Sequence, residues 1–177
     1  MKYLIVSCSL NPDSKSRIMA KAALESLQSK KASVELIDLA DLKPPICDGA
    51  AVYGDPAAQE LAEKVEAADG ILIATPIYNY DVNAAAKNLI ELTGRAWTEK
   101  IAGFLCAAGG QGSYMSVMAL ASSLMLDFRT IIIPRFVYAT GDQFQGNEVS
   151  HEDLGKRIEQ LADELLRFTS ALRGSIT

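Results

Sequence analysis

Apolar runs of strand length alternate along the chain with amphipathic stretches of helix length. The five predicted strands are KYLIVSC at 2–8, SVELIDL at 33–39, GILIAT at 70–75, IAGFLCAA at 101–108 and RTIIIPRFVY at 129–138. The predicted helices cover roughly 15–30, 56–68, 83–95, 113–127 and 152–172. Near-continuous apolar strands separated by helices indicate a parallel sheet covered on both faces. The sequence therefore predicts one doubly wound α/β domain over residues 1–177.

Composition and charge narrow the class of protein. Of the 177 residues, 49% are hydrophobic and 22% are charged, which argues against disorder. No apolar run reaches bilayer length, and the net charge of −5 gives no general attraction to nucleic acid. The three cysteines are widely spaced, with neither disulfide nor zinc spacing. We therefore expect a soluble, cytoplasmic protein with reduced thiols and no bound metal, nucleic acid or membrane.

The chain has a single histidine, His151, which limits the chemistry it can perform. This residue lies in the polar segment NEVSHEDLGK at the expected start of the last helix, where a solvated or capping role is expected. A Ser-His-Asp triad, a Cys-His pair or a histidine-rich metal site would have to be built around it. The sequence therefore disfavours all three.

In a doubly wound sheet, ligands bind beyond the carboxyl ends of the strands. The loop after the first strand offers hydroxyls, an amide and two cations, on Ser9, Asn11, Ser14, Lys15, Ser16 and Arg17. A helix start with such donors favours an anion and predicts a phosphate cradle, although the same side chains could simply cap the helix. The loop has no glycine and no GK[ST], so it is neither a Rossmann fingerprint nor a Walker motif. A single terminal phosphate suits it best.

The segment TPIYNYDVNAAAKN follows the third strand. Its candidate binding residues are Pro76, Ile77, Tyr78, Asn79 and Tyr80. They could line a flat heterocycle, or they could form a turn with tyrosines packed on the sheet edge. On the next predicted helix, Lys87 and Asn88 are consistent with exposed surface.

The fourth strand ends in a glycine-rich turn, CAAGGQGSYMS. Its candidate binding residues are Gly109, Gly110, Gln111 and Gly112. Glycines permit positive φ and let backbone N–H groups approach a ligand, but any tight strand-to-helix turn can also use them. The prediction of a site rests on all three loops reaching the same sheet edge.

At these loops the chain resembles the NADPH-dependent FMN reductase family, flavodoxin-like proteins that include bacterial quinone, azo-dye and flavin reductases. SLNPDSKSR is similar to the family's S-x-R-x-x-S-x-N, TPIYNYDVNAAAKN to P-x-Y-N before a helix carrying L-K-N, and AAGGQG to its glycine turn. The resemblance implies a three-layer α/β/α fold with a five-stranded parallel sheet in the order 2-1-3-4-5. It also implies FMN, with the phosphate on Ser9, Ser14 and Ser16, the ribityl chain and ring along residues 76–79, and the pyrimidine edge near residues 109–112.

Three departures from the family pattern stand out. Asn11 occupies a position where many relatives have arginine, and Asp13 adds a negative charge to the phosphate loop. Asn83 and Ala86 replace the usual proline and leucine. The first two changes predict modest FMN affinity, and the choice between NADPH and NADH stays open.

The resemblance implies an FMN-dependent oxidoreductase that passes hydride from NADPH or NADH to the flavin and on to a quinone, azo compound, free flavin or metal ion. The flavin carries that chemistry, so no catalytic residue is expected. Two alternatives are a flavodoxin-type electron carrier and a scaffold that has lost the cofactor. Apolar helices near 83–95 and 113–127, together with the family's usual assembly, predict a homodimer or homotetramer.

Overall fold

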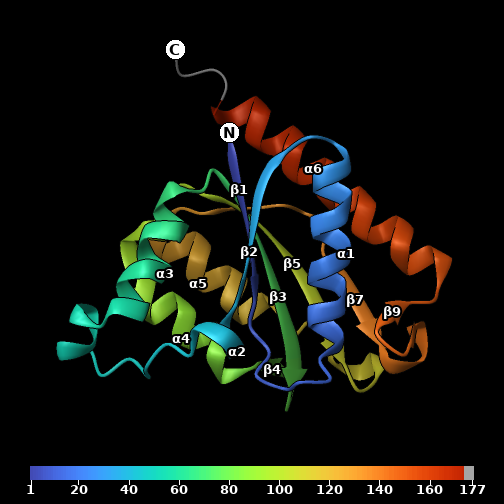
Figure 1. Ribbon diagram of the computed structural model, residues 1–177, viewed down its shortest axis with the longest axis horizontal. Helices are drawn as coiled ribbons and strands as arrows, with labels where there is room; N and C mark the ends of the chain where they lie inside the picture. Colours follow the sequence, from blue (N-terminus) through green and yellow to red (C-terminus); the bar gives the residue numbers. More distant parts are fainter. Residues whose placement is uncertain (174–177) are drawn as a thin grey trace.

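A parallel sheet runs through the middle of the molecule in the computed structural model, which describes residues 1–173 (Figure 1). Its strands are β1 Lys2–Ser7, β2 Ser33–Asp38, β3 Gly70–Tyr78, β5 Ile101–Ala108, β6 Ile131–Ile132 and β7 Val137–Thr140, with β4 Asp81–Val82 antiparallel to the end of β3. The order is β2-β1-β3-β5-β6, and β7 pairs with β5 as well. The predicted order 2-1-3-4-5 is therefore confirmed.

The predicted count of five strands is wrong, because the sheet has seven within the described residues. The segment expected to be one strand at 129–138 forms β6 and β7, both parallel to β5, with Pro134 between them. Proline has no N–H to donate, and the Arg135 N–H bonds back to the Ile133 carbonyl at 2.7 Å, so the chain leaves the ladder there. The other additional strand is β4, which was not predicted because two residues are too few to show the alternation of a strand.

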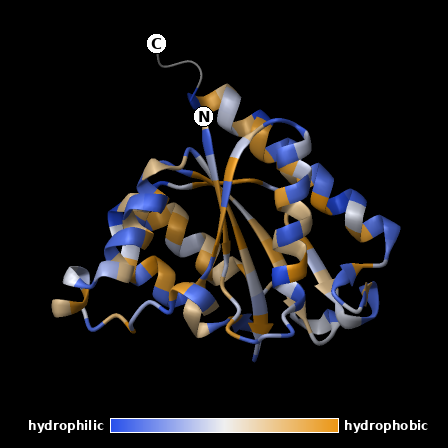
Figure 2. Cartoon of the chain, viewed as in Figure 1, coloured by the Kyte–Doolittle hydropathy of each residue, from blue (hydrophilic) through white to orange (hydrophobic). Residues whose placement is uncertain are grey.

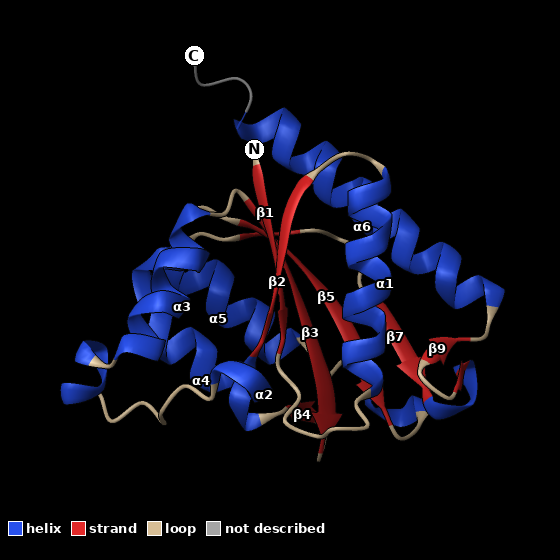
Figure 3. Ribbon diagram, viewed as in Figure 1, coloured by secondary structure: helices blue, strands red, loops and turns tan. Residues whose placement is uncertain are grey.

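Helices cover both faces of the sheet (Figure 3). One face carries α1 Lys15–Ser29 and α6 Glu152–Arg173, and the other carries α3 Pro56–Ala67, α4 Ala84–Thr93 and α5 Met118–Phe128. The shorter elements are α2 Leu39–Leu42, η1 Ala51–Gly54, η2 Gly94–Trp97, η3 Gln111–Ser113, η4 Gly141–Gln143, and the hairpin of β8 Phe144–Gln145 and β9 Glu148–Val149. The helix predicted from residue 113 begins at Met118, since η3 and a turn come first.

Alternation along the strands divides the core into two layers. On β1, Leu4 and Val6 pack toward α3, α4 and α5, whereas Tyr3 and Ile5 pack toward α1 and α6. Figure 2 shows the central strands as largely hydrophobic and the helices as mixed. No helix of the described chain is long and apolar enough to span a bilayer. Because both faces are covered, the open end of the sheet is left for ligand binding.

Candidate functional site

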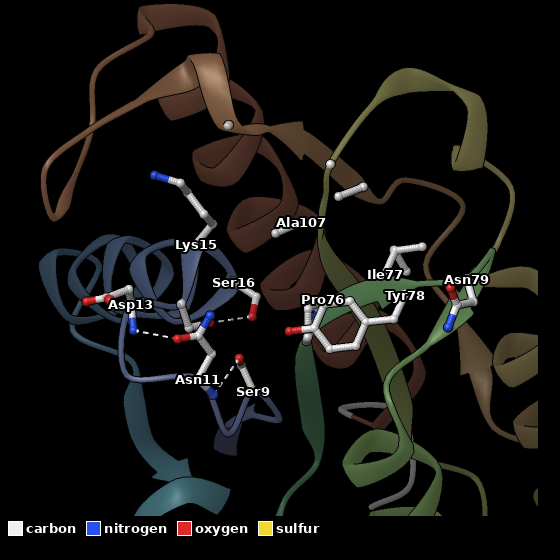
Figure 4. A pocket seen from close by; sticks show the side chains of 14 residues that line it. Ser9, Asn11, Asp13, Lys15, Ser16, Pro76, Ile77, Tyr78, Asn79 and Ala107 are labelled. Atoms are coloured by element: carbon white, nitrogen blue, oxygen red, sulfur yellow. Dashed lines mark hydrogen bonds between the residues drawn. The ribbon is translucent and has the colours of Figure 1, made fainter.

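The loops after β1, β3 and β5 open into one cavity of about 690 Å³ at the carboxyl edge of the sheet (Figure 4). This volume falls within the roughly 300–1,000 Å³ of small-molecule sites. The lining residues are Ser9, Asn11, Asp13, Ser14, Lys15, Ser16, Pro76, Ile77, Tyr78, Asn79, Ala107, Ala108, Gly109 and Gly141. The structure thus brings together most of the candidate residues. Those that do not line the cavity are Arg17, Tyr80, Gly110, Gln111 and Gly112.

The hydroxyls of the first loop form a buried cluster at the start of α1. Ser14 is the N-cap, because its Oγ accepts a hydrogen bond from the Arg17 N–H at 3.1 Å. Its Oγ also lies 3.0 Å from Ser16 Oγ, and Ser9 Oγ accepts from the Asn11 N–H at 3.3 Å. In the described chain the Ser16 and Lys15 N–H groups have no bonding partner, as expected for a first helical turn. One end of the cavity is therefore rich in donors.

Arg17 holds this loop in shape and does not face the cavity. Its guanidinium donates to the Asn11 carbonyl at 2.7 Å and to the Ser9 carbonyl at 2.9 Å, and it forms a close ion pair with Asp38 at the end of β2. The hydrogen bond to Asp38 raises the pKa of Arg17 above its ordinary value. Its charge is therefore largely neutralised by Asp38.

The remaining charges at this end of the cavity are few. Lys15 Nζ lies 5.2 Å from the centre of the Phe144 ring, a cation–π distance. Asn11 Oδ1 accepts from the Asp13 N–H at 3.0 Å, which leaves the Asn11 NH₂ group as a further donor. Since Asp13 opposes the charge of Lys15, neutral donors and the helix start must account for most of the attraction to an anion.

The segment after β3 forms a tight hairpin at the cavity edge. Tyr78 pairs with Asp81, so Asn79 and Tyr80 are the two turn residues, with φ of 51° and 63°. Positive φ at both positions is typical of a type I′ turn; asparagine tolerates it, but tyrosine rarely adopts it. Tyr78 is about half exposed and lines the cavity, whereas Tyr80 is more exposed, with its hydroxyl beside Gly112. The Tyr78 ring extends toward the serine loop in Figure 4.

None of the glycines in the turn after β5 has a positive φ, so the expectation that glycine is needed there for a left-handed backbone is wrong. A Cβ built on Gly109 or Gly110 would instead meet no atom within 4 Å, which leaves room for a ligand to approach the backbone. Tyr138 of β7 holds this turn in place, because its hydroxyl donates to the Gly110 carbonyl and lies 2.7 Å from Ser113 Oγ. Gln111 bonds to Thr140 Oγ1 at 3.3 Å.

Several cavity residues were not predicted. Ala107 and Ala108 end β5, and Gly141 directly follows β7, so the rule that ligands bind beyond strand ends would have found them had it been applied to these positions. The expected exposure of Asn88 is wrong. It is buried, accepts from the Cys47 N–H at 2.8 Å and donates to the Pro45 carbonyl at 2.9 Å.

The described chain offers little acid–base or metal chemistry at the cavity. It contains no cluster of three or more histidine, cysteine, aspartate or glutamate side chains that could hold a metal. The Cys8 and Cys106 thiols are buried, and burial raises the pKa of Cys106 to about 12, so these thiols stay neutral. A site with donors, an aromatic ring and open backbone suits a ligand that brings its own reactivity.

A family model described as NADPH-dependent FMN reductase matches residues 1–145. The chain is 31% identical over 144 residues to an NAD(P)H-dependent FAD/FMN reductase of Geobacillus thermodenitrificans, covering 79% of this chain and 77% of the relative. It is 32% identical over 152 residues to an NADPH:quinone oxidoreductase of Arabidopsis thaliana, covering 80% and 76%. Among solved structures, the flavoenzyme NAD(P)H:(acceptor) oxidoreductase FerB of Paracoccus denitrificans matches with a TM-score of 0.78 at 19% identity, covering 96% and 97%.

Proposed function

The chain belongs to the NADPH-dependent FMN reductase family, and from this premise we propose that it is an FMN-dependent oxidoreductase that oxidises NADPH or NADH and reduces a small-molecule acceptor. The acceptor classes we propose are a quinone, an azo compound, a free flavin or a metal ion, and the names of the relatives support the first three. One observation carries the proposal: a single cavity joins a donor-rich helix start to an aromatic hairpin and an open glycine turn.

The donor-rich end fits the phosphate of FMN. Ser14 and Ser16 present hydroxyls there, the unpaired N–H groups of the first turn of α1 point to an anion site, and Lys15 adds a positive charge. Arg17 supports these donors by holding the loop carbonyls. Because Asp13 lies on the same cavity, the phosphate site is only weakly cationic and the predicted affinity is modest.

The other end fits a flat ring. Residues 76–79 supply one wall, and Gly109 leaves open space where another residue would place a Cβ. Backbone donors of the glycine turn are suited to the ring edge where negative charge develops on reduction. When bound, FMN would supply the hydride and electron transfer, so the chain has only to bind it, orient it and keep one face accessible.

Anaerobic mixing of the FMN-loaded protein with NADPH or NADH tests this function directly. We expect loss of the visible absorption of oxidised flavin within seconds. Retention of that absorption, with reduction by dithionite alone, would assign the chain to the electron carriers. Failure of the purified protein to bind added FMN would instead favour the scaffold alternative.

We also propose that the chain forms a homodimer or homotetramer through α5. The apolar side chains of α4 are mostly buried in the core, which leaves α5 as the apolar helix available for an interface. There Met118, Met125 and Leu126 are exposed, Leu126 by 85% of its surface. Covering such a group removes apolar surface from water.

Free thiols at all three cysteines support a reducing, cytoplasmic location, which we likewise propose.

A further inference from the structure

Asn83 places a buried amide where β1, β3 and α4 meet. Its Nδ2 donates to the Cys8 carbonyl at 2.7 Å, and its Oδ1 accepts from Thr75 Oγ1 at 3.1 Å and from the Ala86 N–H at 3.2 Å. Only 7% of Asn83 is exposed. A buried amide must find partners for its polar atoms, and here both of its ends are bonded.

The two strands that this amide joins lead directly into the two ends of the cavity. Cys8 precedes Ser9 in the serine loop, and Thr75 precedes Pro76 before the hairpin. The last backbone bond between these strands runs from the Cys8 N–H to the Ala74 carbonyl. Beyond it, within residues 1–173, the Asn83 side chain makes the one hydrogen-bonded connection between the serine loop's strand and the hairpin's strand.

Helix capping alone does not account for this arrangement. A cap needs one oxygen that accepts from the first turn, which serine, threonine or aspartate supplies as well as asparagine. The NH₂ group is required only for the bond to the Cys8 carbonyl.

We propose that Asn83 is a positioning residue that sets the spacing between the phosphate end and the ring end of the cavity. The inference rests on the proposed function, because FMN must reach both ends at once. Riboflavin lacks the phosphate and uses the ring end alone. A change of spacing therefore weakens FMN binding and leaves riboflavin binding nearly unchanged.

Asn83→Ser tests this, since the hydroxyl can still cap α4 but cannot reach the Cys8 carbonyl. Titrations with FMN and riboflavin should show about a tenfold loss for FMN, the size expected when one buried hydrogen bond is lost, and less than a twofold loss for riboflavin. Asn88→Ser is the matched control. It removes another buried amide, which lies within α4 and makes two hydrogen bonds, but its partners lie at residues 45 and 47, away from the cavity. It should leave both affinities within twofold of the wild type.

An equal loss for both ligands in Asn83→Ser, or no loss for either, would overturn the positioning role. If that variant does not fold, Thr75→Val removes one bond to the Asn83 amide and should lower the ratio of FMN to riboflavin affinity in the same direction; an unchanged ratio would also overturn the proposal. Failure of the proposed function would appear already in the wild type, as equal or absent binding of the two flavins, and would overturn both.

Discussion

Replacing Ser16 by alanine separates the two roles of hydroxyls at the start of α1. Ser16 is buried, and the one hydrogen-bond partner of its hydroxyl in the described chain is Ser14 Oγ, at 3.0 Å. In Ser16→Ala the Ser14 cap is still bonded to the Arg17 N–H, and alanine is a better helix former than serine. The apo-protein should therefore melt close to the wild-type temperature.

The effect on FMN should be much larger. A hydrogen bond to a charged group is worth roughly 1.5 to 3 kcal/mol, and about 1.4 kcal/mol corresponds to a tenfold change in affinity. Ser16→Ala should therefore weaken FMN binding by roughly ten- to hundredfold, while riboflavin affinity stays the same. Fluorescence-quenching titrations with both flavins measure this difference.

Ser14→Ala should behave differently, because Ser14 also caps the helix. Loss of a cap costs about 1 kcal/mol, which lowers the melting temperature of a protein of this size by roughly 2–4 °C. Ser26→Ala is a matched control on the same helix, since the Ser26 hydroxyl is buried without a partner in the described chain. It should change neither FMN affinity nor, by more than a degree or so, the melting temperature. If Ser16→Ala binds FMN within twofold of the wild type, the phosphate does not bind at this loop.

Three further changes test other parts of the structure. In Arg17→Lys a single ammonium group cannot bond to the loop carbonyls and Asp38 at once, so the free energy of unfolding should fall by roughly 1–3 kcal/mol in thermal denaturation. An unchanged melting transition would contradict the role of Arg17 in holding the loop. Leu126→Glu should shift the protein toward monomer in light scattering, whereas a wild-type monomer at micromolar concentration would refute the α5 interface. Burial raises the pKa of the Cys106 thiol from 9.0 to about 12, so as the pH rises this thiol loses its proton in the unfolded chain before it does so in the folded protein. Stability to urea should therefore fall between pH 9 and 12, and less steeply in Cys106→Ala.

The periodicity of apolar residues predicted which helices and strands form, but it predicted less well where they begin and end. Alternating apolar strands and helices predict a parallel sheet covered on both faces, because successive parallel strands need crossovers. The order 2-1-3-4-5 came from the family resemblance. The break at Pro134 is consistent with proline chemistry, but an otherwise apolar run predicts one continuous strand there. The β3–β4 hairpin needed knowledge of positive φ at Tyr80, which the residue type itself argues against.

At the site, the sequence correctly indicated which segments would meet and was less informative about individual side chains. Arg17 was expected on the phosphate because it is a cation beside a helix start, yet Asp38 pairs with it from the end of β2. Asn88 was expected on the surface, yet the partners that bury it are the backbone groups of Pro45 and Cys47. None of these partners could be assigned from spacing along the chain.

The amino-acid sequence by itself determined the order of elements along the chain and the sheet edge where the three cavity loops gather. This is because burial of apolar residues is dictated by periods of two and 3.6 that are local to each segment. Only the tertiary structure decided which polar groups face the cavity and which satisfy one another. Buried donors and acceptors must be paired, and the partners of Arg17 and Asn83 include residues from distant segments that only folding brings within 3 Å or so. Ser16 therefore remains a candidate for the phosphate, while Arg17 supports the backbone of the loop that contains Ser9 and Asn11.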